Sequence, residues 1–584
     1  MGHRRFLPEN HDYRNRTVEF DGKIEHGKVR EEFDAFSRVR NLNVVLGKKT
    51  QGKKTKEKKT KGKKTKGKKL ILNHPTFGKK KSVFWDLPYW EHLQVRHCLD
   101  VMHIEKNVCE SLLGLLLNIP GKTKDGINVR KDMQEMGIRE GLHPFPHPKG
   151  FFLPPACYTM SNKEKRMFCE CLHGIKVPSS YSANIKRLVS LKDSKLLGMK
   201  SHDCHVLMTH MIPIAIRGSL PDKIRHTITK LCLFFNTIHS KVIDPQSLES
   251  LQKEIIVTLC ELEMYFPPSF FDVMVHLVIH IVREIQACGP VFLRYMYPFE
   301  RYMGFLKGYV KNRSRPEGSI VEGYTSEEVN EFCPGYLNGV KSIGVPQSRH
   351  SGRLQGRGGV GMRTIFPSYD SLQLAHFVVL QHMACIAPYV NEHMETLQST
   401  YQGRTAYWYK KKHNEEFASW LKSKVMANGQ GDVDLVVQKL GQGPNINVTS
   451  YQGYDINGYT FYTKDQDGKS TMQNSGVTVV ATSTQYDRTN RDILTRIAKN
   501  SYYGVIHEIW ELDYGFTTIP VFKCKWVNNT RGVTVDKYGF TLVDLNTDGY
   551  ASEPFVLAKL VTQVFFVNDP SKPKWDIVVQ GKRS

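Results

Sequence analysis

A stripe of polar side chains with chemical potential lies within the stretch from Phe84 to Pro120. His97, Asp100, His103 and Asn107 follow one another at i, i+3, i+6 and i+10. Apolar residues of the same stretch also recur at helical spacing, and residues 91–113 contain neither Pro nor Gly. A helix that buries one face and aligns His and Asp on another is either a core helix with satisfied polar groups or the wall of a polar site.

A second set of histidines raises the question of a metal site. The set is His202, His205, His210, His276 and His280. His276 and His280 stand at i, i+4, but no third ligand is apparent, and a zinc site needs three or four ligands. We therefore expect these histidines to be core or surface residues. HExxH, P-loop and GxSxG motifs are absent, and GRGGVG lacks the strand–helix context of a dinucleotide site.

The chain of 584 residues has a net charge of +25, and about half of it is local. Residues Lys48 to Lys69 include thirteen Lys and one Glu. Like charges at this density repel one another, so the sequence predicts a disordered, Lys-rich linker over 47–81. Such a segment could neutralise nucleic-acid phosphates or serve as a nuclear localisation signal, and it could equally be a solvated linker.

No segment suggests export or membrane insertion. The N-terminal MGHRRFLPENHDYRN lacks an apolar signal core, and no run of eighteen apolar residues exists. Among the twelve Cys only Cys169 and Cys171 are close together, and CxxC is absent. This spacing argues against a zinc ribbon or a disulfide scaffold.

Periodicity predicts helices in the middle of the chain and strands at its end. The helical signal runs from Ser161 to about Asn312, and Ser161 with Glu164 matches a capping box. Within the polar range 428–500, only GYDINGYTFYT and GVTVVAT suggest strands. From Tyr502 onward, five short strand patterns with turn residues between them predict a small β domain.

Three Trp residues of this β domain allow two interpretations. Trp510, Trp526 and Trp575 could stack bases on the surface of a small barrel. We favour a core role for them, because alternation of apolar and polar residues usually marks burial.

Several sequence motifs resemble those of a known protein family. FWDLPYW, RHCLDVMHIEKNV, KSHDCHVLMTH, MYPFERYMGFLKGYVKNRSRPEGSI and WELDY resemble the C-terminal part of the transposase of plant CACTA-type (En/Spm) DNA transposons, with its two associated domains of unknown function. The resemblance implies an α+β multidomain fold. Its elements are a partial RNase H-like core interrupted by an all-α insertion and then a C-terminal small β-barrel or sandwich.

The resulting domain scheme has seven parts. They are the tail of a truncated transposase domain (1–46), the Lys-rich linker (47–81), a helical transposase-associated domain with partial RNase H-like elements (82–335), a Gly/Arg-rich loop (336–368), a helical segment (369–427), a polar linker (428–500) and the C-terminal β domain (501–584).

The resemblance also implies metal-dependent chemistry. RNase H-like transposases use three carboxylates to hold two divalent cations, and Mg²⁺ prefers carboxylate oxygens. Asp86 and Glu300 match two of these carboxylates as vestigial catalytic and metal-binding candidates, and Asp100 with His103 matches a D-x-x-H motif. Each also has a plain structural reading: a turn cap for Asp86, a helical pair for Asp100 and His103, and the helix dipole for Glu300.

The first Asp of the family pattern lies upstream of anything in this chain. Two carboxylates without the third should not hold both metals, so we predict that the chain alone does not cut or join DNA. Mg²⁺ or Mn²⁺ is expected as a cofactor only if a complete active site exists.

Two kinds of basic segment are candidates for DNA binding. The residues are Lys53, Lys54, Lys63 and Lys64 in the Lys run and Arg313, Arg315, Arg349 and Arg353 in later Arg-containing loops. Arg and Lys in such loops position phosphates, although they also simply aid solubility. The sequence therefore favours a nuclear, transposon-derived, catalytically incomplete protein that binds DNA, with transposon ends as the expected partner.

Two alternatives remain open at this point. The chain could be a protein–protein interaction module whose DNA affinity comes only from the Lys run. It could also be the back half of an active DDE transposase that gene prediction has divided. A membrane partner is not expected under either alternative.

Overall fold

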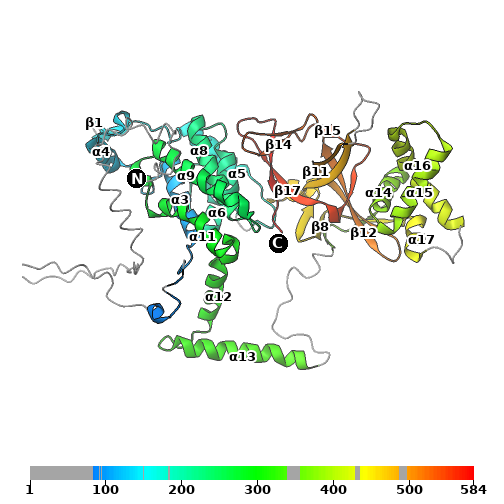
Figure 1. Cartoon of the computed structure of the whole chain (residues 1–584), viewed down its shortest axis with the longest axis horizontal. Coiled ribbons are helices and arrows are strands. Elements are labelled where there is room, and N and C mark those ends of the chain that lie inside the picture. The colour runs from blue at the N-terminus through cyan, green and yellow to red at the C-terminus, as the bar shows by residue number, and fades with distance from the viewer. Residues whose placement is uncertain are drawn as a thin grey trace, which may run out of the picture. The chain divides into compact units, whose positions relative to one another are not determined.

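The computed structural model describes most of the chain from residue 83 onward (Figure 1). The described residues are 83–90, 92–93, 95–148, 150–181, 184–337, 356–427, 434–485 and 496–583. They fall into two compact units. The first unit comprises residues up to Val101, Lys124–Ala156 and Ile238–Arg294, and the second comprises Met102–Thr123, Cys157–Thr237 and Tyr295–Ser584. The predicted segments 1–46 and 47–81 lie outside the described residues.

The first unit consists mainly of helices. They are α4 (Ile127–Glu135), α9 (Leu248–Tyr265), α10 (Val273–Leu277) and α11 (Ile281–Cys288), with the 3-10 turns η2 (Val83–Asp86), η3 (Glu140–Leu142), η6 (Pro245–Ser247), η7 (Pro268–Phe270), η8 (Val278–His280) and η9 (Val291–Arg294) and the hairpin β1 (Phe145–His147) to β2 (Gly150–Phe152). Buried Glu284 accepts hydrogen bonds from the Leu99 backbone N at 2.7 Å and from Arg294 Nη1 at 2.8 Å. These bonds fix the chain segment that leads into helix α3.

The helical part of the second unit begins with α3 and ends with α13. Its elements are α3 (Val101–Leu116), α5 (Asn162–Gly174), η4 (Ile185–Leu188), the hairpin β3 (Val189–Ser190) to β4 (Lys195–Leu196), α6 (Ser201–Val206), the π-helical η5 (Leu207–Met211), α7 (Ile212–Ala215), α8 (Asp222–Ile238), α12 (Tyr297–Gly308) and α13 (Pro316–Tyr336). The capping box predicted at the start of α5 is confirmed: Ser161 Oγ accepts from Glu164 N, and the Glu164 carboxylate accepts from Ser161 N.

The second unit continues with a helical layer and a sheet. The helices are α14 (Tyr369–Gln381), η10 (Ala384–Ile386), α15 (Ala387–Thr400), α16 (Ala406–Ala427), α17 (Leu435–Gln442), α18 (Lys464–Lys469) and η11 (Ala558–Leu560). The strands are β5 (Arg357–Val360), β6 (Arg363–Ile365), β7 (Val448–Tyr451), β8 (Gly453–Ile456), β9 (Tyr459–Tyr462), β10 (Gly476–Gln485), β11 (Arg496–Asp513), β12 (Thr518–Val527), β13 (Val533–Val535), β14 (Thr541–Val543), β15 (Asp548–Gly549), β16 (Phe555–Leu557), β17 (Thr562–Asn568) and β18 (Asp576–Gln580).

Long antiparallel strands organise this sheet. Among the described residues it has eleven strands in the main order β13-β14-β18-β17-β10-β11-β12-β15, with β16 beside β12 and with β7 joining β6 to β11. Consecutive residues of β11 point to opposite faces: Trp510 packs with helices α14, α16 and α17, whereas Ile509 packs with strands β8 and β9. Gly504 is required where Trp526 crosses it, because a Cβ there would lie 2.7 Å from the Trp526 ring.

The sheet extends further into the chain than the domain scheme predicts. The range 428–500, expected to be a polar linker, contains α17, β7–β10 and α18, and the range 336–368, expected to be a loop, contains β5 and β6. The two strand signals within 428–500 are confirmed as β8 with β9 and as β10. The C-terminal part is therefore not a self-contained small barrel or sandwich over 501–584, because β7 and β10 take their hydrogen bonds from β11 and extend its sheet.

The mixed α+β class is confirmed, with helices in the N-terminal half and a sheet-rich C-terminal region. Trp510 and Trp526 are buried, as the core reading predicts. In residues 83–337 the described strands form two short hairpins, so the partial RNase H-like core stays a prediction. None of the helices that the structure describes is both long and apolar enough to cross a bilayer.

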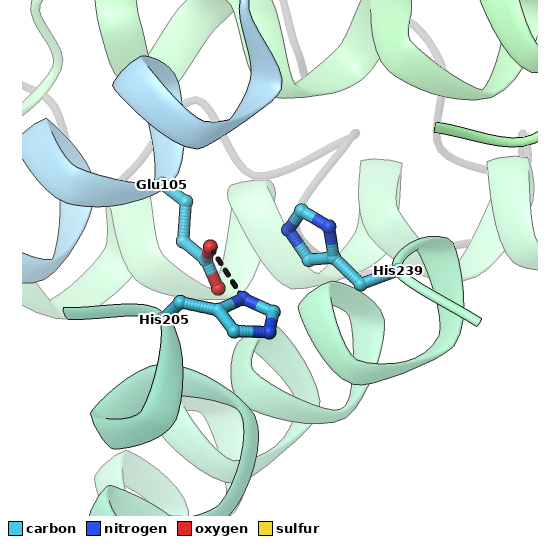
Figure 2. A group of neighbouring side chains, drawn as sticks. All are labelled: Glu105, His205 and His239. Atoms are coloured by element: carbon cyan, nitrogen blue, oxygen red, sulfur yellow. Dashed lines mark hydrogen bonds and ion pairs between the residues drawn. The ribbon is translucent and has the colours of Figure 1, made fainter. Parts of the chain in front are cut away.

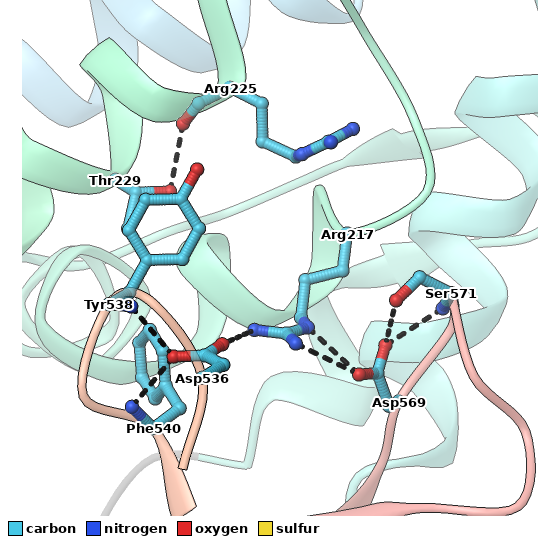
Figure 3. A network of polar contacts seen from close by, with 8 residues as sticks. All are labelled: Arg217, Arg225, Thr229, Asp536, Tyr538, Phe540, Asp569 and Ser571. Carbon is cyan, nitrogen blue, oxygen red and sulfur yellow. Dashed lines mark hydrogen bonds and ion pairs between the residues drawn. The ribbon is translucent and has the colours of Figure 1, made fainter. Parts of the chain in front are cut away.

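One guanidinium joins the helical part of the second unit to its sheet (Figure 3). Arg217, just after α7, donates from Nη1 to Asp536 Oδ2 at 2.6 Å and from Nε to Asp569 Oδ2 at 3.0 Å. Asp536 also accepts from the backbone N of Tyr538 and Phe540, and Asp569 accepts from Ser571. Burial opposes the charge of Arg217, but its hydrogen bonds to Asp536 and Asp569 outweigh that effect and raise the pKa of the guanidinium.

Replacing Arg217 by Ala should therefore destabilise the second unit strongly. The Arg217 side chain is 12% exposed, that of Asp569 is 0% exposed and that of Asp536 is 13% exposed, so the change leaves one buried and one largely buried carboxylate without their cation. We expect a loss of roughly 3–5 kcal/mol in the free energy of unfolding, measured by denaturant titration. The matched control is Arg166→Ala, because the ion pair of Arg166 with Glu170 is exposed and should contribute less than about 1 kcal/mol. Equal effects of the two changes would contradict this role for Arg217.

A buried histidine pair lies between α15 and α16. His393 Nδ1 and His413 Nδ1 are 2.8 Å apart, and both side chains are less than 5% exposed. One ring must donate and the other accept, so protonation of both rings breaks the bond, and burial disfavours a charge on either ring. Burial, followed by the charge of His393, lowers the pKa of His413 to about 4, and burial lowers the pKa of His393.

The pair should make stability depend on pH below neutrality. In the unfolded chain His413 has a pKa near 6.5, whereas in the folded chain its pKa is about 4. The contribution of neutral His413 to the free energy of unfolding is therefore fully present above about pH 6.5 and is lost as the pH falls towards 4. Between pH 7.5 and pH 5, His413 alone should account for a loss of about 2 kcal/mol. The measurement is the denaturant midpoint of the wild type and of His413→Asn at both pH values. The variant should lose this part of the pH dependence, whereas the exposed control His147→Asn should keep it.

Candidate functional site

The structure places all four catalytic candidates at the surface. Asp86 ends the turn η2, Asp100 lies just before α3, His103 lies in the first turn of α3, and Glu300 lies in the first turn of α12. All four side chains are exposed. Asp86 belongs to the first unit and Glu300 to the second, so their pairing as metal ligands stays a prediction. The expected position of Glu300 at the start of a helix is confirmed.

The basic candidates are described only in part. Lys53, Lys54, Lys63, Lys64, Arg349 and Arg353 lie outside the described residues. Arg313 and Arg315 lie in the turn between α12 and α13, and both are exposed. Arg301, Lys307 and Lys311 are exposed on α12 and at the start of the same turn. We call residues 301–315, with these five exposed cations, the α12 basic segment.

A polar centre is buried among α3, α6 and α8 in the second unit. Glu105, on the inner face of α3, is 1% exposed, and its Oε2 lies 3.0 Å from Nδ1 of His205 on α6 (Figure 2). His205 is 15% exposed. The same helix α3 thus has two polar faces: the exposed one that carries His103 and a buried one that carries Glu105.

A π-helical turn directly follows His205. It spans Leu207–Met211, and such turns widen a helix and occur frequently at functional sites. Thr209 Oγ1 donates to the His205 carbonyl at 2.6 Å, and Asn236 Nδ2 on α8 donates to the Thr209 carbonyl at 3.2 Å. These bonds satisfy carbonyl groups in the widened turn and hold His205 on the side of α6 that faces Glu105.

Burial shifts the pKa values of several groups around Glu105 towards their neutral forms. A hydrogen bond with Cys204, followed by burial, raises the pKa of the Cys109 thiol well above its usual value. Burial lowers the pKa of His210 to about 3. Burial also lowers the pKa of Lys582, while the carboxylate of Glu105 opposes that shift. Because only a thiolate is a good nucleophile, this centre is not arranged for thiol chemistry.

The donor atoms at this centre are of a kind that zinc accepts. Figure 2 draws Glu105, His205 and also His239, which follows helix α8. His239 belongs to the first unit, so the second unit itself defines one carboxylate and one imidazole, fewer than the three or four ligands of zinc. In the first unit, His276 Nε2 and His280 Nε2 lie 3.2 Å apart on successive turns.

Sequence reasoning does not find the buried partners of these groups. In the sequence, Glu105 is only one residue of an amphipathic stretch, and His205 is only one of several histidines. The pairing of Glu105 with His205 joins positions 100 residues apart. The hydrogen bonds of the Arg217 guanidinium with two aspartates join positions more than 300 residues apart. The one signal in the sequence is the occurrence of charged residues within otherwise apolar helical runs.

Two family models match the chain. A domain of unknown function (DUF4218) matches residues 238–351, which include α9 to α13, and a second domain of unknown function (DUF4216) matches residues 510–578, which run from the end of β11 into β18. These two domains are typical of plant transposase-like proteins. Comparison with curated proteins and with solved structures gives no match.

Proposed function

We propose that this chain is a transposon-derived, CACTA-type (En/Spm) transposase-like protein that binds DNA in the nucleus and is catalytically incomplete. The observation that carries the proposal is the turn at the end of the α12 basic segment, where the exposed side chains of Lys311, Arg313 and Arg315 lie inside the DUF4218 match. Lys and Arg gathered on one short surface form the electrostatic footprint expected of a nucleic-acid-binding protein. The two matched domains and the sequence motifs that resemble the transposase family support the transposon origin.

Phosphate binding is the chemistry that this segment suits best. Arg313 and Arg315 project from a turn, where a guanidinium can approach a phosphate with two parallel hydrogen bonds. The Ser314 backbone N donates to Asn312 Oδ1 at 2.9 Å, and the Asn312 backbone N donates to Ser319 Oγ at 3.2 Å. These bonds give the turn a defined shape, so its two Arg side chains are presented together.

The salt dependence of DNA binding tests this assignment. We expect the triple variant Lys311→Ala, Arg313→Ala, Arg315→Ala to lower the slope of log K against log[salt] by about 1 for each phosphate that the replaced side chains neutralise. The matched control is Lys410→Ala, Arg531→Ala, Lys537→Ala, which removes three exposed cations elsewhere in the second unit. Both are measured in the full chain and in a form without residues 47–69.

The alternative of an interaction module predicts the opposite pattern. DNA binding would then be unchanged by the triple variant and would disappear with residues 47–69, because the Lys run alone would supply sequence-blind affinity. The observation that favours a role in protein binding is the apolar surface of α12 and α13. Sequence preference that survives deletion of 47–69 would separate the two functions.

Catalytic incompleteness has its own test. Asp86 and Glu300 remain candidates for two of the three carboxylates that a two-metal site needs, and no third carboxylate of this chain is assigned to the pattern. Purified protein with Mg²⁺ or Mn²⁺ should therefore not nick transposon-end DNA. Nicking that Glu300→Ala abolishes, but that the exposed control Glu317→Ala leaves intact, would show an active enzyme instead.

A further inference from the structure

Helices α12 and α13 present a large apolar surface to solvent. Ten large apolar side chains between Phe299 and Leu337 are 44% to 89% exposed. Helix α12 has no buried residue at all. Monomeric proteins rarely expose apolar patches larger than a few hundred Å², and larger ones usually mark interaction sites.

The exposed residues follow the pattern of core-facing helices. In α12, Phe299, Tyr302 and Met303 stand at i, i+3 and i+4, and in α13, Val329 and Phe332 begin the same pattern. Such stripes normally pack against another element. The end of α13 also forms an open hollow of about 540 Å³, lined by Glu328, Val329, Phe332, Cys333, Tyr336 and Leu337.

The two helices form a hairpin whose geometry is fixed from within. The Tyr309 ring packs on Gly323, where a Cβ would come within 2.6 Å of it, and the Tyr309 hydroxyl donates to the Glu327 carboxylate. In Figure 1, α13 runs across the end of α12. The apolar stripes are thus presented by a defined scaffold.

Charge is divided between the two halves of this hairpin. Residues 297–315 contain five Lys or Arg and one Glu, whereas residues 316–336 contain five Glu and neither Lys nor Arg. An acidic helix repels nucleic acid, so α13 does not extend the α12 basic segment as a DNA surface. It requires a partner that is apolar and basic, and α12 has that character.

We propose that the hairpin binds a second copy of this chain, with α13 of each copy lying against α12 of the other. A two-fold axis makes such an interface self-complementary, because each apolar stripe meets the other and each acidic helix meets a basic one. Pairing α13 with α13 would instead oppose ten Glu across the axis. The charge pattern therefore selects the crossed arrangement.

The exposed area is sufficient for a stable dimer. Six of the ten exposed apolar residues are aromatic, and burying an aromatic side chain removes ~150–250 Å² from water. With about half of each side chain already exposed in one copy, the six aromatics alone offer roughly 450–750 Å². A standard interface needs about 800 Å² from each partner, and the four aliphatic residues supply the remainder.

The first test is the mass of the full chain in solution without DNA. We expect light scattering at roughly 10 µM to give twice the 67.0 kDa of one chain. The double variant Val329→Asp, Phe332→Asp should reduce the mass to that of one chain with unchanged circular dichroism. The matched control, Val242→Asp with Leu293→Asp, alters two side chains that are 86% and 75% exposed outside this hairpin and should stay dimeric.

A charge exchange tests the crossed arrangement itself. Glu322→Lys, Glu328→Lys, Glu331→Lys changes the net charge of α13 from −5 to +1, and Arg301→Glu, Lys307→Glu changes that of α12 from +1 to −3. Each variant alone should be a monomer, because its homodimer would oppose like charges, whereas a mixture of the two should form a heterodimer that co-purifies through two different tags. Folding defects cannot produce that rescue.

The outcomes decide the proposal without reference to DNA binding. A wild-type monomer at this concentration would overturn it, and so would a dimer that both sets of variants leave intact. Failure of the mixture to associate would overturn the pairing of α13 with α12. Because no DNA is present, failure of the proposed DNA-binding function would leave these results unchanged.

Discussion

The burial of one cation between two carboxylates joins the helical part of the second unit to its sheet. Arg217 leaves the helical part after α7, while Asp536 and Asp569 come from the ends of two different strand pairs in the sheet. Removing three charges from water is costly, and their mutual attraction offsets that cost only when every remaining lone pair is satisfied. Tyr538, Phe540 and Ser571 supply those hydrogen bonds (Figure 3). The sheet matched by the DUF4216 model is therefore part of a larger unit that includes α7 and α8.

Local signals predict the helices well, because their information is local. The spacing of apolar residues and the capping pair Ser161 and Glu164 place α5 and the helices after it close to where they occur. The two strand signals within 428–500 are correct for the same reason, but their membership of the large sheet is not visible locally. Strand β7 pairs Thr449 with Glu511 of β11, far along the chain. A polar composition before Tyr502 therefore resembles a linker, although distant partners complete a sheet there.

The candidate site shows the same limit. Helical periodicity identifies α3, but the helix begins only at Val101, so His97 and Asp100 of the predicted polar stripe precede it. The pattern also assigns the chemistry to Asp100 and His103, which lie on the surface. The buried polar face of α3, with Glu105, is recognisable only when α6 is known to lie against it and to present His205. The widened turn at Leu207–Met211 is equally hidden, since the sequence of a π-helical turn has no strong signature. Pairing across helices is a property of packing, and periodicity describes only one helix at a time.

The α12 and α13 hairpin shows where periodicity leads to the opposite error. Phe299, Met303 and Leu306 of α12 recur at helical spacing, and an apolar face of this kind usually implies burial. In the structure Phe299 and Met303 are more than 60% exposed, although their spacing is the same as in the buried helix α9. An apolar helical pattern indicates that the helix face packs against another surface. It does not indicate whether that surface belongs to the same chain or to another. The division of charge within the hairpin supplies the missing information. A basic helix and an acidic helix that crosses its end complement each other most fully when the partner is another copy of the same hairpin, and the basic turn at Arg313 and Arg315 is then present twice in one assembly.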